Sequence, residues 1–314
     1  MVTETLKSDS SYQAIFNEMQ NTSRPSWLKR LQRTAFERFE EIGFPSVRDE
    51  EWKYTNVAPL SKINFNPNGA TSSAIPDVTQ FANTEANKSQ LIFVNGILRQ
   101  DLSDLSAVAA DVVLLDLAAA VNDEKYAEIV RAQLGRTADH VSNGFVALNT
   151  ALLNTGAFLY LPKKKNIETP IHLLFLTDSS QENLITSPRV LVVAEESSSA
   201  TLIESYASAR DEIYFTNAVV EVVMNENARL EHYKVQRDGH GAFHIATTAV
   251  TLARNSCYNT TTITLGAQLS RHDIRVSLDD EGAECSVDGL YIVSTGQHTD
   301  THSVIDHRKP HCTS

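Results

Sequence analysis

From Gly156 to Ser314 the sequence is a series of short β-strand patterns with almost no helical pattern between them. The strand segments are rich in β-branched and aromatic residues and recur at roughly 10–15 residue spacing, with turn residues between them. They cover 158–161, 171–176, 189–194, 218–224 and 228–234. This pattern is typical of a sandwich, a barrel or a β-solenoid and argues against a doubly wound α/β fold. Because the spacing varies and regular hairpin turns are missing, we favour a solenoid.

The part of the chain before Gly156 has a mixed pattern. Apolar residues recur at helical spacing over 12–43, and again over 124–134 and 138–155. Asn95-Gly96 lies between two apolar runs and predicts a tight hairpin, because both turn positions need positive φ. The sequence therefore predicts three units: a helical N-terminal region and linker at 1–87, a small mixed α/β unit at 88–155, and a β core at 156–314.

Composition excludes some classes of function. The net charge of −12 and the pI near 5.3 disfavour wide contact with nucleic acid or an anionic membrane, because both need clustered Lys and Arg. No apolar run approaches the ~20 residues that span a bilayer, and the polar first eight residues lack the apolar stretch of a signal peptide. We expect a cytosolic protein that binds neither nucleic acid nor membranes.

The densest group of metal-binding residue types lies near the C-terminus. His298, Asp300 and His302 alternate, so in a strand they share one face, and imidazole and carboxylate are ligands for zinc or iron. The same residues also fit the polar outward face of a strand. His311 and Cys312 extend the group beyond a strand-breaking proline. The candidate metal ligands are His298, His302, His311 and Cys312.

The remaining polar residues do not predict catalysis. The three cysteines are widely spaced without a Cys-x-x-Cys pair, so they form neither a disulfide framework nor an autonomous cluster motif. We interpret His232, His244 and His272 as hydrogen-bonded structural residues. No nucleophile elbow, phosphate loop or His-Glu-x-x-His helix is present. The sequence thus predicts no catalytic and no cofactor-binding residues.

Longer motifs carry a resemblance to a known family. They are RDEEWKYTN at 48–56, PRVLVVAEE at 188–196, YFTNAVVE at 214–221, NARLEHYK at 227–234 and IDHRKPHC at 305–312. In this order they resemble the SufB/SufD family, and within it the SufD branch. Members of this family are scaffold subunits of the SufBCD iron–sulfur cluster assembly complex. The resemblance extends from about Trp27 to Ser314.

The resemblance implies a mainly β protein with an α-helical N-terminal region and a right-handed parallel β-helix core. It implies pairing with SufB through the β-helix and docking of the ATPase SufC, with a homodimer as a further assembly. SufC would hydrolyse ATP, so this chain would be a non-catalytic scaffold that supports iron delivery. It would bind no cofactor tightly, and iron or a cluster only together with SufB. Its compartment would be the cytoplasm, or the plastid stroma for an organellar protein.

The sequence departs from the family at its C-terminal end. Family members continue beyond the His-Cys-x-Ser element with further β-helix rungs and C-terminal helices, and their metal-contacting Cys and His lie in that part. His311 and Cys312 therefore do not correspond to those ligands. We expect the exposed last rung to make residues 1–314 less soluble than a longer relative.

Two other functions remain open on the sequence alone. One is a cupin-type enzyme, a β-barrel with one divalent metal held by His298, Asp300 or His302. It predicts stoichiometric metal that is lost on changing His298 or His302 to alanine. The other is a structural β-solenoid adaptor with no link to iron, whose partner binding would not depend on iron–sulfur demand.

Overall fold

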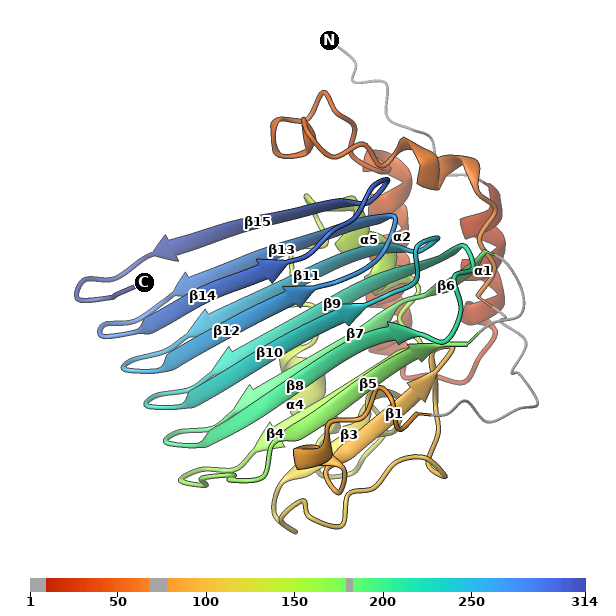
Figure 1. Cartoon of the computed structure of the whole chain (residues 1–314). Coiled ribbons are helices and arrows are strands. Elements are labelled where there is room, and N and C mark those ends of the chain that lie inside the picture. The colour runs from red at the N-terminus through yellow and green to blue at the C-terminus, as the bar shows by residue number, and fades with distance from the viewer. Residues whose placement is uncertain (1–9, 68–77, 179–182) are drawn as a thin grey trace.

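The chain forms a β-solenoid, in which successive rungs stack along one axis and build two mainly parallel β-sheets (Figure 1). This computed structural model describes residues 10–67, 78–178 and 183–314. Within them the eight-stranded sheet has the order β15-β13-β11-β9-β7-β4-β3, with β6 beside β9, and the seven-stranded sheet has the order β14-β12-β10-β8-β5-β1-β2. Successive strands of the core mostly alternate between the sheets. The predicted solenoid is confirmed, and the antiparallel barrel of a cupin-type enzyme is not this fold.

The strands of the first rungs are shorter than those of the later rungs. The eight-stranded sheet consists of β3 (Val113–Asp116), β4 (Thr155–Leu161), β6 (Leu184–Thr186), β7 (Pro188–Ala194), β9 (Tyr214–Met224), β11 (Phe243–Leu252), β13 (Leu269–Leu278) and β15 (His298–His307). The seven-stranded sheet consists of β1 (Gln90–Val94), β2 (Ile97–Leu98), β5 (Ile171–Thr177), β8 (Ser199–Ser208), β10 (Arg229–Arg237), β12 (Cys257–Thr264) and β14 (Glu284–Tyr291). Between the sheets lies the lumen, one half of which is the apolar core around Leu202, Val222, Leu230 and Val250.

Left-handed residues recur at one corner of the solenoid. Their φ values lie between 54° and 72°, and they are Lys164, Ser197, Asn227, Asn255, Gly282 and His311. Each rung hydrogen-bonds to the next here, as in Ser197 N to Glu226 O at 2.9 Å and Asn227 N to Arg254 O at 2.9 Å. From the second of these corners onward, the following residue is small. The same backbone turn therefore recurs in successive rungs.

Helices cover the outer face of the eight-stranded sheet (Figure 1). They are α1 (Ser10–Gln20), α2 (Ser26–Ile42), α3 (Leu117–Ala120), α4 (Ala127–Gln133) and α5 (Gly144–Ala151), with 3-10 turns η1 (Glu50–Trp52), η2 (Ala58–Lys62) and η3 (Thr84–Ala86). Phe36 and Phe39 of α2 pack with Phe145 of α5 against Phe215 of β9. The predicted helical N-terminal region is confirmed. No helix in the described part of the chain is long and apolar enough to cross a membrane.

The region 88–155 contributes strands to both sheets. Asn95 and Gly96, at φ 52° and 77°, form the predicted turn between β1 and β2, and β1 then pairs in parallel with β5. β3 pairs antiparallel with β4. The helix expected over 138–155 is shorter, because Asn143 caps α5 and Thr155 already begins β4. The domain boundaries at 87 and 155 stay a prediction.

Replacing Asn143 with alanine is expected to lower the free energy of unfolding by about 1 kcal/mol. Its Oδ1 accepts from the backbone N–H groups of Phe145 and Val146, at 3.0 and 3.2 Å, and these donors otherwise lose their partner. Urea denaturation followed by circular dichroism measures the change. Asn143→Asp keeps the acceptor and serves as the control; an equal loss in both variants would contradict a capping role.

Candidate functional site

The predicted metal ligands His298 and His302 lie on the outward face of β15, where they contact neighbouring side chains. His298 Nε2 is 3.1 Å from Thr55 Oγ1, and His302 Nδ1 is 3.6 Å from Asp273 Oδ1. Asp300 Oδ2, between them, accepts from Thr55 and Arg271, both at 2.5 Å. The alternate spacing does place the three side chains on one face. On this face, His298 and Asp300 contact Thr55 of the N-terminal region.

Arg271 of β13 organises this contact. Its guanidinium lies 3.9 Å from the centre of the Trp52 ring and donates to Asp300 Oδ2 at 2.5 Å. It also donates to Asp273 Oδ1 at 2.8 Å and to the Glu51 carbonyl at 2.8 Å. We call Trp52, Arg271, Asp273 and Asp300 the arginine clamp. The charged run beside Trp52 is thus tied to the solenoid through the buried indole and a backbone carbonyl.

His311 and Cys312 lie at the opposite end of β15 from His298. His311 is the left-handed residue of the last described corner, with φ 62°, and its side chain is exposed. Cys312 takes the position held in earlier rungs by Ser198, Ala228, Ser256 and Ala283. The four candidate ligands are therefore not one cluster. Among the described residues no group of three or more His, Cys, Asp or Glu is placed to hold a metal ion, and metal binding by single candidates stays a prediction.

The densest group of titratable side chains lies inside the solenoid, in the second half of the lumen. We call it the polar seam, and its residues are Glu204, Tyr206, His232, Lys234, Gln236, Asp238, His244, Thr248, Tyr258, Thr262 and His272. Every one of them is buried. The polar strand residues alternate with outward residues, as His232, Lys234 and Gln236 do along β10, and this alternation was the signal available in the sequence.

The contacts within the polar seam divide it into three groups. His232 joins Glu204 Oε2 at 3.0 Å through Nε2 and the Tyr258 hydroxyl at 2.9 Å through Nδ1. Lys234 Nζ is 2.9 Å from His244 Nε2, and His244 Nδ1 is 3.0 Å from Asp238 Oδ2. His272 contacts the hydroxyls of Thr248 and Thr262, at 2.9 and 3.3 Å. The interpretation of the three histidines as hydrogen-bonded residues agrees with these contacts, and their gathering in one lumen was not predicted.

Burial shifts the protonation equilibria of the polar seam. Desolvation lowers the pKa of Lys234 to about 8 and lowers the pKa of His272 well below its usual value. Desolvation also raises the pKa of Tyr206 well above its usual value. The pKa of Glu204 is lowered: burial opposes ionisation, but the contact with His232 outweighs it. The seam therefore favours the neutral forms of His272 and Tyr206.

Stability is expected to rise with pH between about 8 and 10.5 through Lys234, by at most about 3 kcal/mol. In this window the unfolded chain keeps the proton on Lys234 and the folded chain has released it, so the unfolded state binds more protons. The measurement is the difference in unfolding free energy between wild type and Lys234→Met at several pH values, which cancels the other titrations. A difference that does not change with pH would contradict the lowered pKa.

Cys257 and Cys285 have little thiolate character. Burial raises the pKa of Cys285 to about 11 and raises the pKa of Cys257. The thiolate is the form that binds metals, so both side chains are poor ligands near neutral pH. Cys312 Sγ is 3.2 Å from the Asp280 carbonyl.

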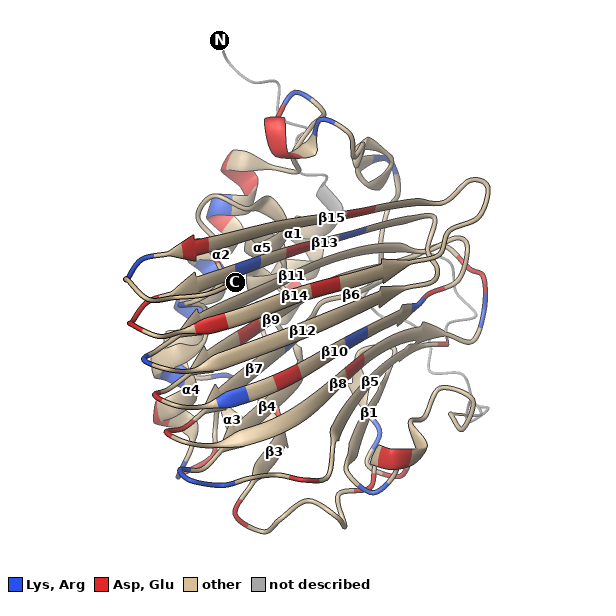
Figure 2. Ribbon diagram, turned by 60° about the vertical axis from the view of Figure 1, so that its left-hand side comes forward, with Lys and Arg blue, Asp and Glu red and all other residues tan. Residues whose placement is uncertain are grey.

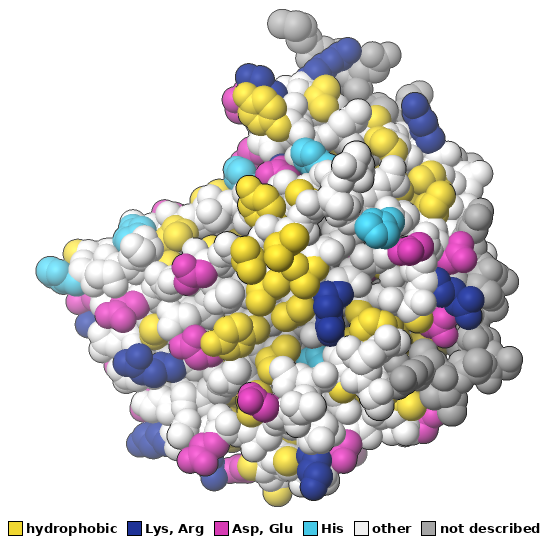
Figure 3. Space-filling model, viewed as in Figure 1, with side chains coloured by type: hydrophobic (Ala, Val, Ile, Leu, Met, Phe, Trp, Pro, Cys, Tyr) yellow, Lys and Arg dark blue, Asp and Glu magenta, His cyan; other side chains and the backbone are white. Residues whose placement is uncertain are grey.

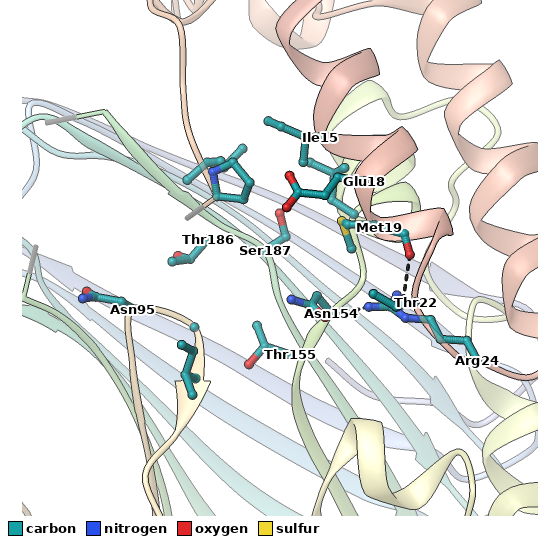
Figure 4. A pocket seen from close by; sticks show the side chains of 15 residues that line it. Ile15, Glu18, Met19, Thr22, Arg24, Asn95, Asn154, Thr155, Thr186 and Ser187 are labelled. Carbon is teal, nitrogen blue, oxygen red and sulfur yellow. Dashed lines mark hydrogen bonds between the residues drawn. The ribbon is translucent and has the colours of Figure 1, made fainter. Parts of the chain in front are cut away.

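A cavity of about 330 Å³ lies between α1, the β1–β2 hairpin and β6 (Figure 4). Ile15 and Met19 of α1 face it together with Asn95, Asn154 and Thr186. Arg24 at its rim donates to the Leu153 carbonyl at 2.5 Å and to Asn154 Oδ1 at 2.6 Å. Because protein acceptors already bind this guanidinium, we assign no ligand to the cavity.

The outer face of the seven-stranded sheet is covered at its β1 end and exposes hydrophobic side chains toward β14. Val78, Phe81 and Leu102 cover the face of β1 and β5. Toward β14 hydrophobic side chains are exposed and gather on this face (Figure 3), and they are Tyr233, Leu265, Leu290 and Ile292. Basic and acidic residues are interspersed along the solenoid (Figure 2). This exposed apolar patch is the kind of surface that protein partners bind.

Sequence profiles of known families match nearly the whole chain. The profile described as SufBD protein N-terminal region matches residues 6–173, and the one described as SUF system FeS cluster assembly, SufBD core domain, matches residues 175–314. The chain belongs to the SufBD family. The boundary between the two SufBD profiles falls within β5, inside the solenoid.

Individual SufBD proteins give the same result. The iron–sulfur cluster assembly SufBD family protein slr0076 of Synechocystis is 31% identical over 96% of this chain and 68% of its own length. SufD of Bacillus subtilis is 28% identical over 75% of this chain, and SufB of the same organism is 25% identical over 94%. The matched region spans only 54% and 60% of these two Bacillus proteins. The chain is SufD-like and shorter than these relatives.

Proposed function

We propose that this chain is a non-catalytic scaffold subunit of iron–sulfur cluster assembly. The observation that carries the proposal is the match of both SufBD profiles, in order, to a chain that folds as one β-solenoid with a helical cover. A long rigid stack of parallel strands presents broad surfaces to other proteins, as solenoids generally do. We place it in the cytoplasm, or in the plastid stroma if the protein is organellar.

The proposed partners are a SufB-like subunit and the ATPase SufC. A relative named SufD and a relative named SufB both match this chain, which supports a role in the same assembly system. The exposed apolar patch near β14 offers a surface for a protein partner or for a second copy of the chain. Interspersed charges of both signs support the further proposal that nucleic acid and membranes are not partners.

Iron and clusters are proposed as cargo that this chain holds only together with SufB. The donor chemistry supports this, because burial keeps Cys257 and Cys285 protonated and the four candidate ligands lie at two ends of β15. His298 and Asp300 already contact Thr55. The absence of a tightly bound cofactor is therefore part of the proposal, and metal analysis of the purified chain tests it.

Anaerobic co-purification tests the proposed function. The tagged chain 1–314 is expressed with SufB and SufC from the same source, beside a full-length SufD control. We expect capture of SufB, because the solenoid surface is present. Capture of neither subunit, while the control captures both, would contradict the scaffold proposal. Capture that does not respond to iron–sulfur demand would favour the adaptor function.

A further inference from the structure

Four polar atoms of the polar seam lack a hydrogen-bond partner among the described residues. They are Glu204 Oε1, the Tyr206 hydroxyl, Gln236 Oε1 and His244 Nδ1, the last of which is only 3.0 Å from Asp238 without good hydrogen-bond geometry. Glu204 and Tyr206 are at most 1% exposed and Gln236 is fully buried. A buried polar atom without a partner is costly, and such atoms are normally satisfied by protein or by ordered water.

Lys234 has hydrogen-bond donors that lack acceptors. Its ammonium group has three N–H donors, and it contacts His244 Nε2 at 2.9 Å and the Tyr206 ring at 4.9 Å. No described carboxylate oxygen lies within 4.0 Å of Lys234 Nζ. A buried charge without a direct counter-charge needs other polar partners.

Strand register places these donors beside the unpaired acceptors. Lys234 of β10 is the direct register partner of Glu204 of β8, and both side chains point into the lumen. Neighbouring strands lie about 4.8 Å apart, so the two side chains are immediate neighbours, and polar groups that are close but not in direct contact are the kind that a water molecule bridges. Tyr206 lies next along β8 on the same face, and its hydroxyl faces Glu204 without hydrogen-bond geometry.

We propose that the lumen binds at least one ordered water molecule between Glu204 and Lys234. The water donates to Glu204 Oε1 and accepts from Lys234 Nζ, and its second hydrogen is available to the Tyr206 hydroxyl. It thereby joins two separate groups into one chain of polar contacts: Tyr258, His232, Glu204, water, Lys234, His244, Asp238 and Tyr214. Within it, His244 and Asp238 lie 3.0 Å apart without good hydrogen-bond geometry.

The chain reaches the surface at Asp238. This residue is on the wall of a polar hollow of about 260 Å³ that Ser208, Arg210 and His240 also line. Asp238 therefore connects the buried polar groups around Lys234 and Glu204 with this hollow. Lys234 is the one lysine or arginine among the named members of the seam. The other titratable members are Glu204, Tyr206, His232, Asp238, His244, Tyr258 and His272.

The first test is a crystal structure of the 314-residue chain at a resolution that shows ordered water. We expect a water peak within about 2.6–3.2 Å of both Lys234 Nζ and Glu204 Oε1. A direct ion pair between these two atoms, or a space between them without density, would overturn the proposal.

The second test counts internal water in solution by ¹⁷O magnetic relaxation dispersion. Lys234→Met removes the donors at nearly unchanged length and is expected to lower the number of long-lived waters by at least one. Arg229→Met, at an exposed position of the same strand, is the matched control and should leave the number unchanged. The same number in all three proteins would contradict the water site. The crystal structure decides the matter if Lys234→Met does not fold.

Discussion

Replacing Glu221 with glutamine is expected to lower the free energy of unfolding by about 3–5 kcal/mol. Glu221 of β9 and Arg189 of β7 are both fully buried, and Arg189 donates to Glu221 Oε2 at 3.1 Å through Nε and at 2.6 Å through Nη2. The glutamine leaves a buried guanidinium without a carboxylate. Such an uncompensated charge costs far more than the pair itself contributes.

Glu221 has a second role that increases the effect. Its two carboxylate oxygens accept from the backbone N–H groups of Gly135, Thr137 and Ala138, at 2.9–3.0 Å. Arg189 in turn donates to Asn149 Oδ1 of α5 at 3.0 Å. The pair therefore fastens the segment after α4 and helix α5 to the eight-stranded sheet.

Urea denaturation followed by circular dichroism measures this change. The control is Glu281→Gln, because Glu281 pairs with Arg254 at 3.1 Å with both side chains 45% exposed, and such pairs contribute at most about 1 kcal/mol. The double variant Arg189→Met, Glu221→Leu replaces both charges by apolar groups and should recover part of the loss. A loss in Glu221→Gln no larger than in Glu281→Gln would contradict the structural role.

Replacing Arg271 with methionine is expected to cost about 3 kcal/mol or more and to release the segment around Trp52 from the solenoid. The change leaves Asp273 buried without its guanidinium partner, and burial already raises the pKa of this carboxyl group. It also removes the cation that lies over the Trp52 ring and the donor to the Glu51 carbonyl. Together with the bond to Asp300, the arginine clamp loses four interactions at once.

The fluorescence of Trp52 and urea denaturation together measure this effect. Arg275→Met is the matched control. Arg275 lies four residues after Arg271 on the same face of β13 and pairs with Glu51 across an exposed 3.1 Å contact. Arg271→Lys keeps the charge but loses the planar fork, so we expect it to fall between wild type and Arg271→Met. Equal stability of Arg271→Met and Arg275→Met would contradict the clamp.

Local patterns were sufficient for the individual elements. Helical spacing predicted α2 because its apolar residues must share one face, and Asn95-Gly96 predicted the hairpin because few other residues accept two positive φ angles. The sequence did not predict the repeating corner, because its residues share a backbone conformation and not a residue type. They include Lys164, Ser197, Gly282 and His311. Alternate spacing correctly placed His298 and His302 on one face, but it could not reveal that Thr55 and Asp273 occupy that face.

By itself the sequence determined the fold class, the helical N-terminal region and the family, because each depends on residues close in the chain or on motifs of eight or nine residues. Only the tertiary structure decided which polar residues meet. Glu204 and Lys234 are 30 positions apart and face each other because parallel register brings β8 beside β10. Register depends on the length of every rung and on packing of the whole core, and no local pattern contains that information.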